Sequence, residues 1–533
     1  LAGLFGLPLD TLRQREAHRR HRRMAAITAL AVLVMLVTSV LAVQAVMARK
    51  AAERRQKQAE VLVDFMLGDL NDKLSQVGRL DILSSVNDKA MAYFQSLPST
   101  DVTEQALEQR AKALVKIGTV RSEQGDFDKA LQAFRAAAEL SGLLAKSKPR
   151  DVERQLAHAE IRAFIGLNHW NQGDMAGAEQ AFRAAHDILI AARRFAPSNA
   201  QLLFQLSTID NNIGHVVEAD GHIEQATQYY RSMLDAAQQL AKLDPDNVEW
   251  QSQLATAHNN LAKMALLQGD LAGAIAGYRE DMAVKARSVE RDPRNNAQRR
   301  LLLITRATLG RTLALKGQLD DGAALLRSAV EEAKRLHAME PSSTDYQKDV
   351  GLYALQLARL ERQRGDPEAA TRLLQESLAM LDRLVATSPD RPDWKRTRAE
   401  ALTEQAAQAI AAGGRASEAA AQLREALDVL EPQLAQNPQE RSTVLATLDA
   451  RLQLASISAE PLRTELAKRT LATIDAQASA GDDPRLLALR ADALRRSGRA
   501  AEASKVAKAL LASGYRSPGA GKTLRVAGKP APP

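Results

Sequence analysis

The amino-acid sequence predicts an all-α protein in which one transmembrane helix precedes a solenoid of long helical hairpins. Ala, Leu, Gln, Glu and Arg, which all favour helices, are abundant, and runs of alternating β-branched residues are missing. Residues 24–43 form an uncharged, apolar run of twenty residues. Glycine recurs at a constant interval of 48 residues through most of the chain. These observations predict the fold class, the membrane segment and the repeat.

Length and composition favour an extended architecture. The chain has 533 residues, more than one globular domain usually holds, and its aromatic content of 4% is low for several separate cores. It contains no Cys, which excludes disulfides, thiolate metal sites and a cysteine nucleophile.

The net charge of +8 is concentrated near the amino end. Residues 1–57 hold eleven basic and three acidic residues, and the remaining chain holds 61 of each. Because the chain after residue 57 has no net charge, it is poorly suited to binding the phosphate backbone of a nucleic acid. We therefore expect no nucleic-acid partner.

Residues 24–48 are the predicted transmembrane helix. At 1.5 Å per residue, the run of twenty reaches roughly 30 Å, the thickness of the hydrocarbon core. Basic residues flank it on both sides, with slightly more on the amino side; they are Arg13, Arg15, Arg19, Arg20, Arg22 and Arg23, then Arg49, Lys50, Arg54, Arg55 and Lys57. This bias favours a single-pass protein of the bacterial inner membrane, with a cytoplasmic amino end and periplasmic repeats.

A cleaved signal peptide is the alternative for this segment. Val43-Gln44-Ala45 loosely resembles a cleavage site, but the apolar run is longer than signal peptides usually have. Cleavage there would release a secreted, soluble repeat protein. Residues 1–23 otherwise form a basic cytoplasmic juxtamembrane segment, and because the chain begins with Leu1 we expect a missing upstream part.

The repeat consists of two interleaved series. The glycines are Gly125, Gly173, Gly221, Gly269, Gly317, Gly365 and Gly413; half a period later come Pro149, Pro197, Pro245, Pro293, Pro341 and Pro389, with Pro438 one residue late. Each repeat is thus two helical segments of about twenty residues, one ended by glycine and one by proline. The predicted unit is a helical hairpin.

Small and large residues recur at fixed distances from each glycine. Seven positions before it stand Gly118, Gly166, Gly214, Ala262, Gly310, Ala358 and Ala406, and nine after it stand Phe134, Phe182, Tyr230, Tyr278, Leu326 and Leu374. A small residue lets two helices approach closely, and a large one fills the space beside it. We therefore expect each small residue to contact the large residue of its own hairpin.

These hairpins resemble the tetratricopeptide repeat (TPR) family. The resemblance rests on segments such as IGTVRSEQGDFDKALQAFRAA (117–137) and LAKMALLQGDLAGAIAGYRED (261–281). It covers residues 107–437, with divergent repeats and a cap over 438–513, and the period of 48 exceeds the family's 34. The resemblance implies a TPR-like α-solenoid with lengthened helices, preceded by a helical linker and cap at 49–106 and followed by a disordered tail at 514–533.

Residues 60–95 predict two amphipathic helices that cover the first repeat. This segment also resembles one that follows the membrane helix in large bacterial receptor-like proteins. That family carries a toll/interleukin-receptor-type, kinase-type or DNA-binding domain before the membrane helix, and GLPLDTLRQRE (6–16) would end the linker from such a domain.

The sequence offers no catalytic, cofactor or metal site. Its nine His residues include no HExxH pattern, and no nucleophile elbow is present. SPGAGKT (517–523) resembles the end of a phosphate-binding loop, but Arg516 stands where the motif needs Gly. We expect no enzyme activity within this chain and no cofactor.

The resemblance instead implies binding residues along the inner groove, on the first helix of each hairpin. They are Trp170, Asn211, His215, Glu218, Asn259, Lys263, Arg311 and Arg359. Polar residues of both signs suit an extended peptide or protein segment, although any exposed helix surface has a similar mixture. The position after the small residue lacks the Asn of the family's carboxylate clamp, which disfavours a C-terminal carboxylate ligand.

The leading hypothesis is a membrane-anchored interaction or scaffold module that binds a protein or peptide partner. It would contact the bilayer through residues 24–48, and self-association is a further option. It would be the sensor part of a transmembrane signalling protein if an effector domain precedes it. The alternatives are a fragment of a signalling enzyme, kinase-type or nucleotide-hydrolysing, whose catalytic domain lies upstream, and a secreted soluble TPR protein.

Overall fold

The fold is all-α, as predicted. A computed structural model describes residues 9–67, 88–89, 91–92, 103–477 and 482–518. These residues form nineteen helices and no strand. The chain divides into two compact units, Leu1–Lys148 and Pro149–Pro533.

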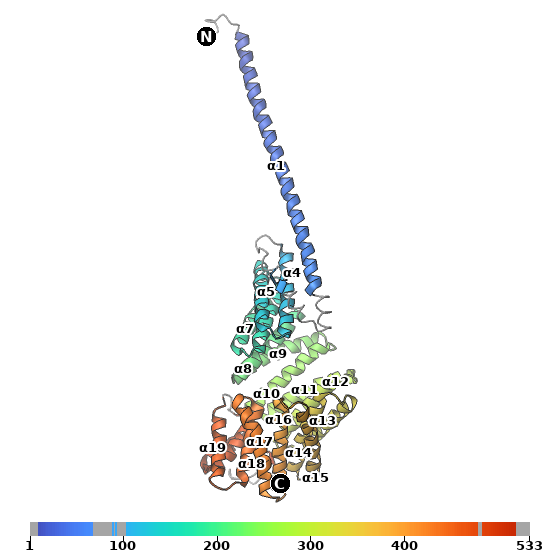
Figure 1. The fold of residues 1–533 in the computed structure, drawn as a ribbon, viewed down its shortest axis with the longest axis vertical. Coiled ribbons are helices and arrows are strands. Elements are labelled where there is room, and N and C mark those ends of the chain that lie inside the picture. The colour runs from blue at the N-terminus through green and yellow to red at the C-terminus, as the bar shows by residue number, and fades with distance from the viewer. Residues whose placement is uncertain (1–8, 68–87, 90, 93–102, 478–481, 519–533) are drawn as a thin grey trace. The chain divides into compact units, whose positions relative to one another are not determined.

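The first unit contains the predicted membrane segment within α1 (Leu9–Leu67), a single helix of 59 residues that Figure 1 shows in blue. His21–Ala51 is long and apolar enough to cross a membrane. Its large apolar side chains are about half exposed or more, from Val32 at 49% to Met24 at 67%. The helix continues past residue 48 because residues 49–67 contain no Gly or Pro. Most of the predicted cap at 60–95 lies outside the described residues.

One hairpin follows in the first unit, formed by α4 (Glu104–Glu123) and α5 (Phe127–Ser147). The side chain of Thr103 caps α4, and that of Asp126 caps α5. Arg121 is buried on α4, where its guanidinium pairs with Asp88 at 2.5 Å.

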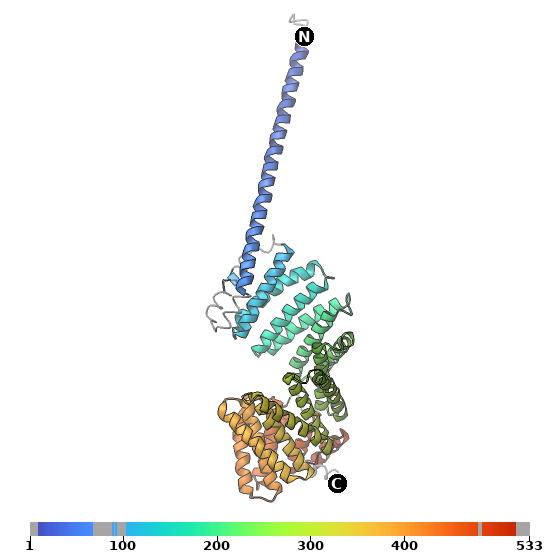
Figure 2. The same cartoon turned by 90° about the vertical axis from the view of Figure 1, so that its right-hand side faces the viewer.

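The second unit is a stack of eight antiparallel hairpins. Figure 2 shows helices of this unit packed side by side. The first helices of the hairpins are α6 (Val152–Asn171), α8 (Ala200–Ala219), α10 (Val248–Leu267), α12 (Asn296–Leu315), α14 (Thr344–Arg364), α16 (Pro392–Ala411), α18 (Arg441–Ile457) and α20 (Pro484–Arg496). The second helices are α7 (Met175–Arg193), α9 (Ile223–Leu243), α11 (Leu271–Arg291), α13 (Leu319–Met339), α15 (Pro367–Thr387), α17 (Ala416–Gln436), α19 (Leu462–Asp475) and α21 (Ala500–Ala512). This is the TPR-like solenoid expected from the repeat.

In four hairpins the turn combines the predicted glycine with an Asp cap that the sequence analysis did not single out, at Asp126, Asp174, Asp270 and Asp366. Gly269 has a φ of +81°, a left-handed conformation that other residues rarely adopt. The next residue, Asp270, accepts a hydrogen bond from the backbone N–H of Gly273 at 2.8 Å and caps α11. At the equivalent position, His222 and Gln318 make no side-chain cap hydrogen bond.

The predicted contact between small and large residues is present. A Cβ atom added to Gly166 would lie 2.5 Å from the ring of Phe182, and one added to Gly118 would lie 2.5 Å from the ring of Phe134. No real Cβ atom comes so close, so these two positions need glycine for the helices to approach.

The carboxyl end of the chain packs back onto earlier repeats of the second unit. Leu510 and Tyr515 share a hydrophobic core with Leu271, Ile275 and Leu309 of α11 and α12. In Figure 2 the carboxyl-terminal end, in red, lies beside the olive helices. The carboxyl-terminal helices α20 and α21 therefore return to α10–α13 and contact them through apolar side chains.

This packing corrects the prediction that the disordered tail begins at residue 514. Tyr515 is only 6% exposed, and the backbone N–H of Arg516 donates a hydrogen bond of 2.8 Å to the carbonyl of Leu315. Burial of the large Tyr515 ring in the shared core orders this segment. Residues 519–533 lie outside the described residues.

Candidate binding pocket

The first helices of successive hairpins surround a pocket of about 600 Å³, here called the central pocket. Its wall includes residues of α8, α10, α12, α14 and α16, the start of α18, and the carboxyl-terminal Arg485 and Ser517. Its charged lining residues are Glu218, Lys263, Arg311, Arg359, Glu400, Glu440, Arg441 and Arg485.

The repeat itself places one row of cations in this pocket. Lys263, Arg311 and Arg359 each stand six positions before a repeat glycine, on α10, α12 and α14. Because successive hairpins stack in the same register, equivalent positions of neighbouring first helices lie side by side. All three side chains consequently line the central pocket.

The first cation of the row is neutralised by a buried carboxylate. Lys263 forms an ion pair with Glu218, whose side chain is 12% exposed and also accepts a hydrogen bond of 3.1 Å from the hydroxyl of Tyr230. Burial alone would raise the pKa of Glu218, but His215, Lys263 and Tyr230 together outweigh it and hold the pKa below its usual value. Glu218 therefore stays ionised and paired at neutral pH.

The third cation of the row is also paired. Arg359 lies 3.2 Å from a carboxylate oxygen of Glu400 and 3.9 Å from one of Glu404, both on α16. Burial opposes the charge of Arg359, but Glu400 and other nearby carboxylates outweigh this, and the net effect raises its pKa.

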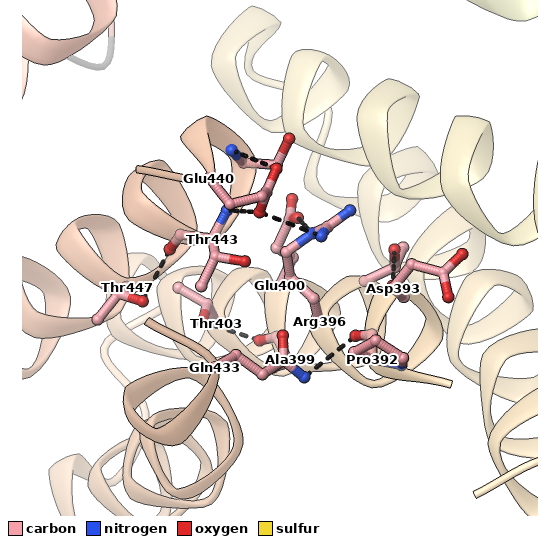
Figure 3. A network of polar contacts seen from close by, with 12 residues as sticks. Pro392, Asp393, Arg396, Ala399, Glu400, Thr403, Gln433, Glu440, Thr443 and Thr447 are labelled. Carbon is pink, nitrogen blue, oxygen red and sulfur yellow. Dashed lines mark hydrogen bonds and ion pairs between the residues drawn. The ribbon is translucent and has the colours of Figure 1, made fainter. Parts of the chain in front are cut away.

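A further arginine, Arg396, connects two of the acids at this wall, as Figure 3 shows. Its guanidinium lies 3.3 Å from Glu440 and 3.9 Å from Glu400. Glu440 also accepts hydrogen bonds from the backbone N–H groups of Ser442 and Thr443 at 3.1 and 2.7 Å, which caps α18. The contacts of Arg396 thereby fasten α16 to the start of α18.

The carboxyl-terminal hairpin adds a third charge cluster. Asp483 is fully buried and lies 2.8 Å from Arg485 and 3.5 Å from Arg441. One carboxylate thus serves two guanidinium groups that both line the pocket.

Four of the eight predicted groove residues, Glu218, Lys263, Arg311 and Arg359, line the central pocket. The other four contact residues of the solenoid itself. Trp170 packs edge-on against Phe182 and His215, with ring centroids 6.4 Å apart in each pair. The binding role of all eight residues stays a prediction.

The polar members of that second group are held by hydrogen bonds. Asn211 accepts one of 2.8 Å from Asn260, and Asn259 donates one of 3.0 Å to the buried Asp281. The ring Nδ1 of His215 lies 3.0 Å from the hydroxyl of Tyr230.

Sequence reasoning missed Arg485, Tyr278 and Ser517, which also line the pocket. Tyr278 carried a signal, since it is the large residue of its hairpin. Arg485 and Ser517 lie beyond the regular repeats, where no register relates them to the inner wall. The rest of the SPGAGKT segment after Pro518 falls outside the described residues.

The arrangement contains ion pairs rather than ligands for a metal. Within the described part of the chain, no group of three or more His, Asp or Glu residues could hold a metal ion. The pocket offers guanidinium and hydroxyl donors beside a leucine-rich wall, which suits binding by charge and apolar contact.

Comparison with known proteins finds similarity of fold. No family model matches the chain, and no curated protein matches it in sequence. The apo form of RapI is 11% identical over 84% of this chain and 98% of its own, with a TM-score of 0.46. The apo form of the quorum sensor NprR from B. thuringiensis is 10% identical over 79% of this chain and 99% of its own, with a TM-score of 0.44.

A signal transduction ATPase with a tetratricopeptide repeat sensor, PH0952 from Pyrococcus horikoshii, is 12% identical over 72% of this chain, with a TM-score of 0.40. This chain spans about half of that protein, 48%. These likenesses concern the fold alone, and the TPR-like description rests on the chain's own repeat geometry.

Proposed function

We propose that the chain is a membrane-anchored module for protein interaction, in which the solenoid holds a protein or peptide segment against its inner wall. The observation that carries this proposal is the inner wall itself, where stacked first helices present polar residues of both signs at repeated positions. Such surfaces recognise extended segments through side chains placed at regular intervals.

The anchor in this proposal is α1. Its apolar segment leaves large side chains such as Met24 and Leu41 more than half exposed, which is costly in water and favourable in lipid. The slightly larger number of basic residues on the amino side favours, in this proposal, a cytoplasmic amino end and repeats outside the inner membrane of a bacterium. Fractionation with carbonate extraction tests this: the chain should stay with the membranes, and recovery in the soluble periplasmic fraction would overturn the anchor.

Reversal of pocket charges tests partner binding. The full chain in lipid nanodiscs captures partners from a membrane extract, and the captured proteins are compared among wild type, Lys263→Glu, Arg311→Glu and Arg359→Glu. Arg231→Glu, on the exposed face of α9, is the matched control. Arg311→Glu is the most informative variant because its side chain makes no ion pair within the described residues.

The proposal expects the reversals to lose a partner that the control variant retains. Circular dichroism confirms that each variant is folded before the comparison. An unchanged set of partners with all three reversals would remove the inner wall as the binding surface.

We further propose, from the resemblance of residues 60–95 and 6–16 to bacterial receptor-like proteins, that the chain is the sensor part of a transmembrane signalling protein. In the alternative form, the complete protein is a signalling enzyme whose catalytic domain precedes this segment. The reading frame upstream of Leu1 tests both forms: a folded effector domain encoded there supports them, and a start codon close to Leu1 would refute them.

A further inference from the structure

The carboxylates of the central pocket are all matched by cations. Glu218 pairs with Lys263, Glu400 with Arg359, and Glu440 with Arg396, while Asp483 lies between Arg485 and Arg441. Each acid has at least one basic partner within 4 Å, and Asp483 has two. Five cations line the pocket, Lys263, Arg311, Arg359, Arg441 and Arg485, against three carboxylates, so positive charge exceeds negative charge even when the neighbouring Asp483 is counted.

Arg311 carries much of this excess. Among the residues that the structure describes, its guanidinium has no acidic partner within 4 Å and makes only a weak contact of 3.5 Å with the hydroxyl of Thr308. Arg311 is exposed to water inside the pocket. The protein around the pocket lowers the pKa of Arg311 and the positive charge of Arg485 lowers it further, while Tyr353, Tyr278 and Glu400 offset part of this effect.

Arg311 and Arg485 both line the central pocket, and the acid that pairs with Arg485 also pairs with Arg441. An anion bound by the two arginines would offset the excess positive charge and would receive charge-assisted hydrogen bonds. The hydroxyl-bearing residues Tyr278 and Ser517 also line the pocket and could donate to such an anion, whereas the hydroxyl of Thr308 already donates to the carbonyl of Ile304 at 2.9 Å.

The wall beside these cations is apolar. Leu266 and Leu267 of α10, Leu315 of α12, Leu326 of α13 and Leu360 of α14 all line the pocket. Its volume of about 600 Å³ falls within the range of sites that enclose small organic molecules. The carboxyl-terminal hairpin contributes to this enclosure through Arg485.

We propose that the central pocket binds a small amphipathic organic anion, with its carboxylate or phosphate oxygens bound by Arg311 and Arg485 and its apolar body against the leucines. This site goes beyond the binding of a protein partner, because the ligand is a small molecule held within the central pocket. Since Arg485 belongs to α20, a bound anion also holds the carboxyl-terminal hairpin in place.

Calorimetric titration of the full chain in lipid nanodiscs tests the proposal, with empty nanodiscs as the reference. The probes are phenylbutyrate, phenyl phosphate, the neutral phenylbutyramide and the cationic phenylbutylamine. We expect at least one of the two anions to bind about tenfold or more tightly than the neutral and cationic probes, because a guanidinium–anion bond is strong when partly desolvated. The preferred anion identifies the head group.

Three variants assign the binding to Arg311. Arg311→Met should weaken anion binding about tenfold or more, and Arg311→Lys should keep part of it. Arg231→Met, which removes an exposed arginine outside the pocket, should leave binding unchanged. Arg311→Met should fold, because no ion pair of Arg311 is lost, and circular dichroism checks this. Hydrogen exchange should also slow in α20 and α21 when the anion is bound.

The proposal is overturned if neither anion binds, if the amide binds as tightly as the acid, or if Arg311→Met binds like wild type. Partner capture by the inner wall is measured separately with protein from membrane extracts. Failure of anion binding therefore does not imply failure of partner capture, and failure of partner capture does not imply failure of anion binding.

Discussion

Replacement of Asp210 by Asn should change the stability of the second unit relative to wild type, and this change should be more favourable at alkaline pH than at acidic pH. Asp210 lies on α8 in the interior and is fully buried. Neither of its carboxylate oxygens has a hydrogen bond of good geometry, and its nearest basic group is Nε2 of His186 at 3.4 Å. Burial raises the pKa of Asp210 to about 7, although Ser232 and Arg193 offset part of the effect.

The size and sign of the effect follow from this pKa. In the unfolded chain the carboxyl has its ordinary pKa of 3.8, so the two states differ by about 3 pKa units. Between these values the folded state keeps a proton that the unfolded chain releases, so stability falls as pH rises. Above a pH of about 8 the carboxyl of Asp210 is ionised in the folded state too. The full cost of ionising it in the interior, about 4 kcal/mol, then destabilises the wild type. Asn does not titrate and has no such cost.

Urea unfolding of the full chain in detergent, followed by tryptophan fluorescence, measures this difference at about pH 5 and about pH 8. The free energy gained by Asp210→Asn should be about 2–3 kcal/mol larger at the higher pH. Any cost of Asn that does not depend on pH cancels in the comparison. A gain that is equal at both pH values would refute a raised pKa at Asp210.

A matched control uses the buried Asp281. Asp281 pairs with Lys285 at 2.8 Å and accepts hydrogen bonds from Asn259 and Thr305. Asp281→Asn leaves Lys285 without its carboxylate, so we expect this variant to be destabilised at both pH values.

Three further predictions concern stability, measured by urea unfolding of the full chain. Gln318→Asp should stabilise the second unit by about 1 kcal/mol by supplying the missing cap of α13, and Asp270→Ala should destabilise it by a similar amount; no change in either would contradict the capping argument. Gly214→Ala should destabilise by about 1–3 kcal/mol because its Cβ would enter the ring of Tyr230, and adding Tyr230→Leu should recover part of the loss. Arg451→Met should cost about 1–3 kcal/mol, since it removes the 2.5 Å ion pair with Glu431 and leaves Glu431 paired only with Arg469 at 3.2 Å; a loss below about 0.5 kcal/mol would show that the pair contributes little.

The repeat could be predicted from sequence because its determinants are local. A glycine such as Gly269 ends a helix through its own backbone conformation, and Gly166 and Phe182 belong to one hairpin. The same register placed Lys263, Arg311 and Arg359 in one row on the inner wall. These features depend on residues within one or two periods of each other.

The central pocket could not be predicted from sequence, because its wall depends on contacts between distant parts of the chain. Tyr515 packs near Leu271, and no periodic pattern relates these two positions. Arg485 follows the regular repeats, so its arrival at the pocket depends on how far successive hairpins rotate. That rotation is the sum of many small packing angles, which the sequence pattern does not specify.

During synthesis, the apolar faces of α10–α13 leave the ribosome long before the carboxyl-terminal helices that contact them. Leu271 and Leu510 share one core but are about 240 residues apart, which at roughly 5–20 residues per second corresponds to roughly 10–50 s of translation. During that time these side chains lack part of their final contacts, so a nascent chain would expose apolar surface that chaperones can bind. A ribosome that stalled before α20 would leave this surface open and the pocket unfinished.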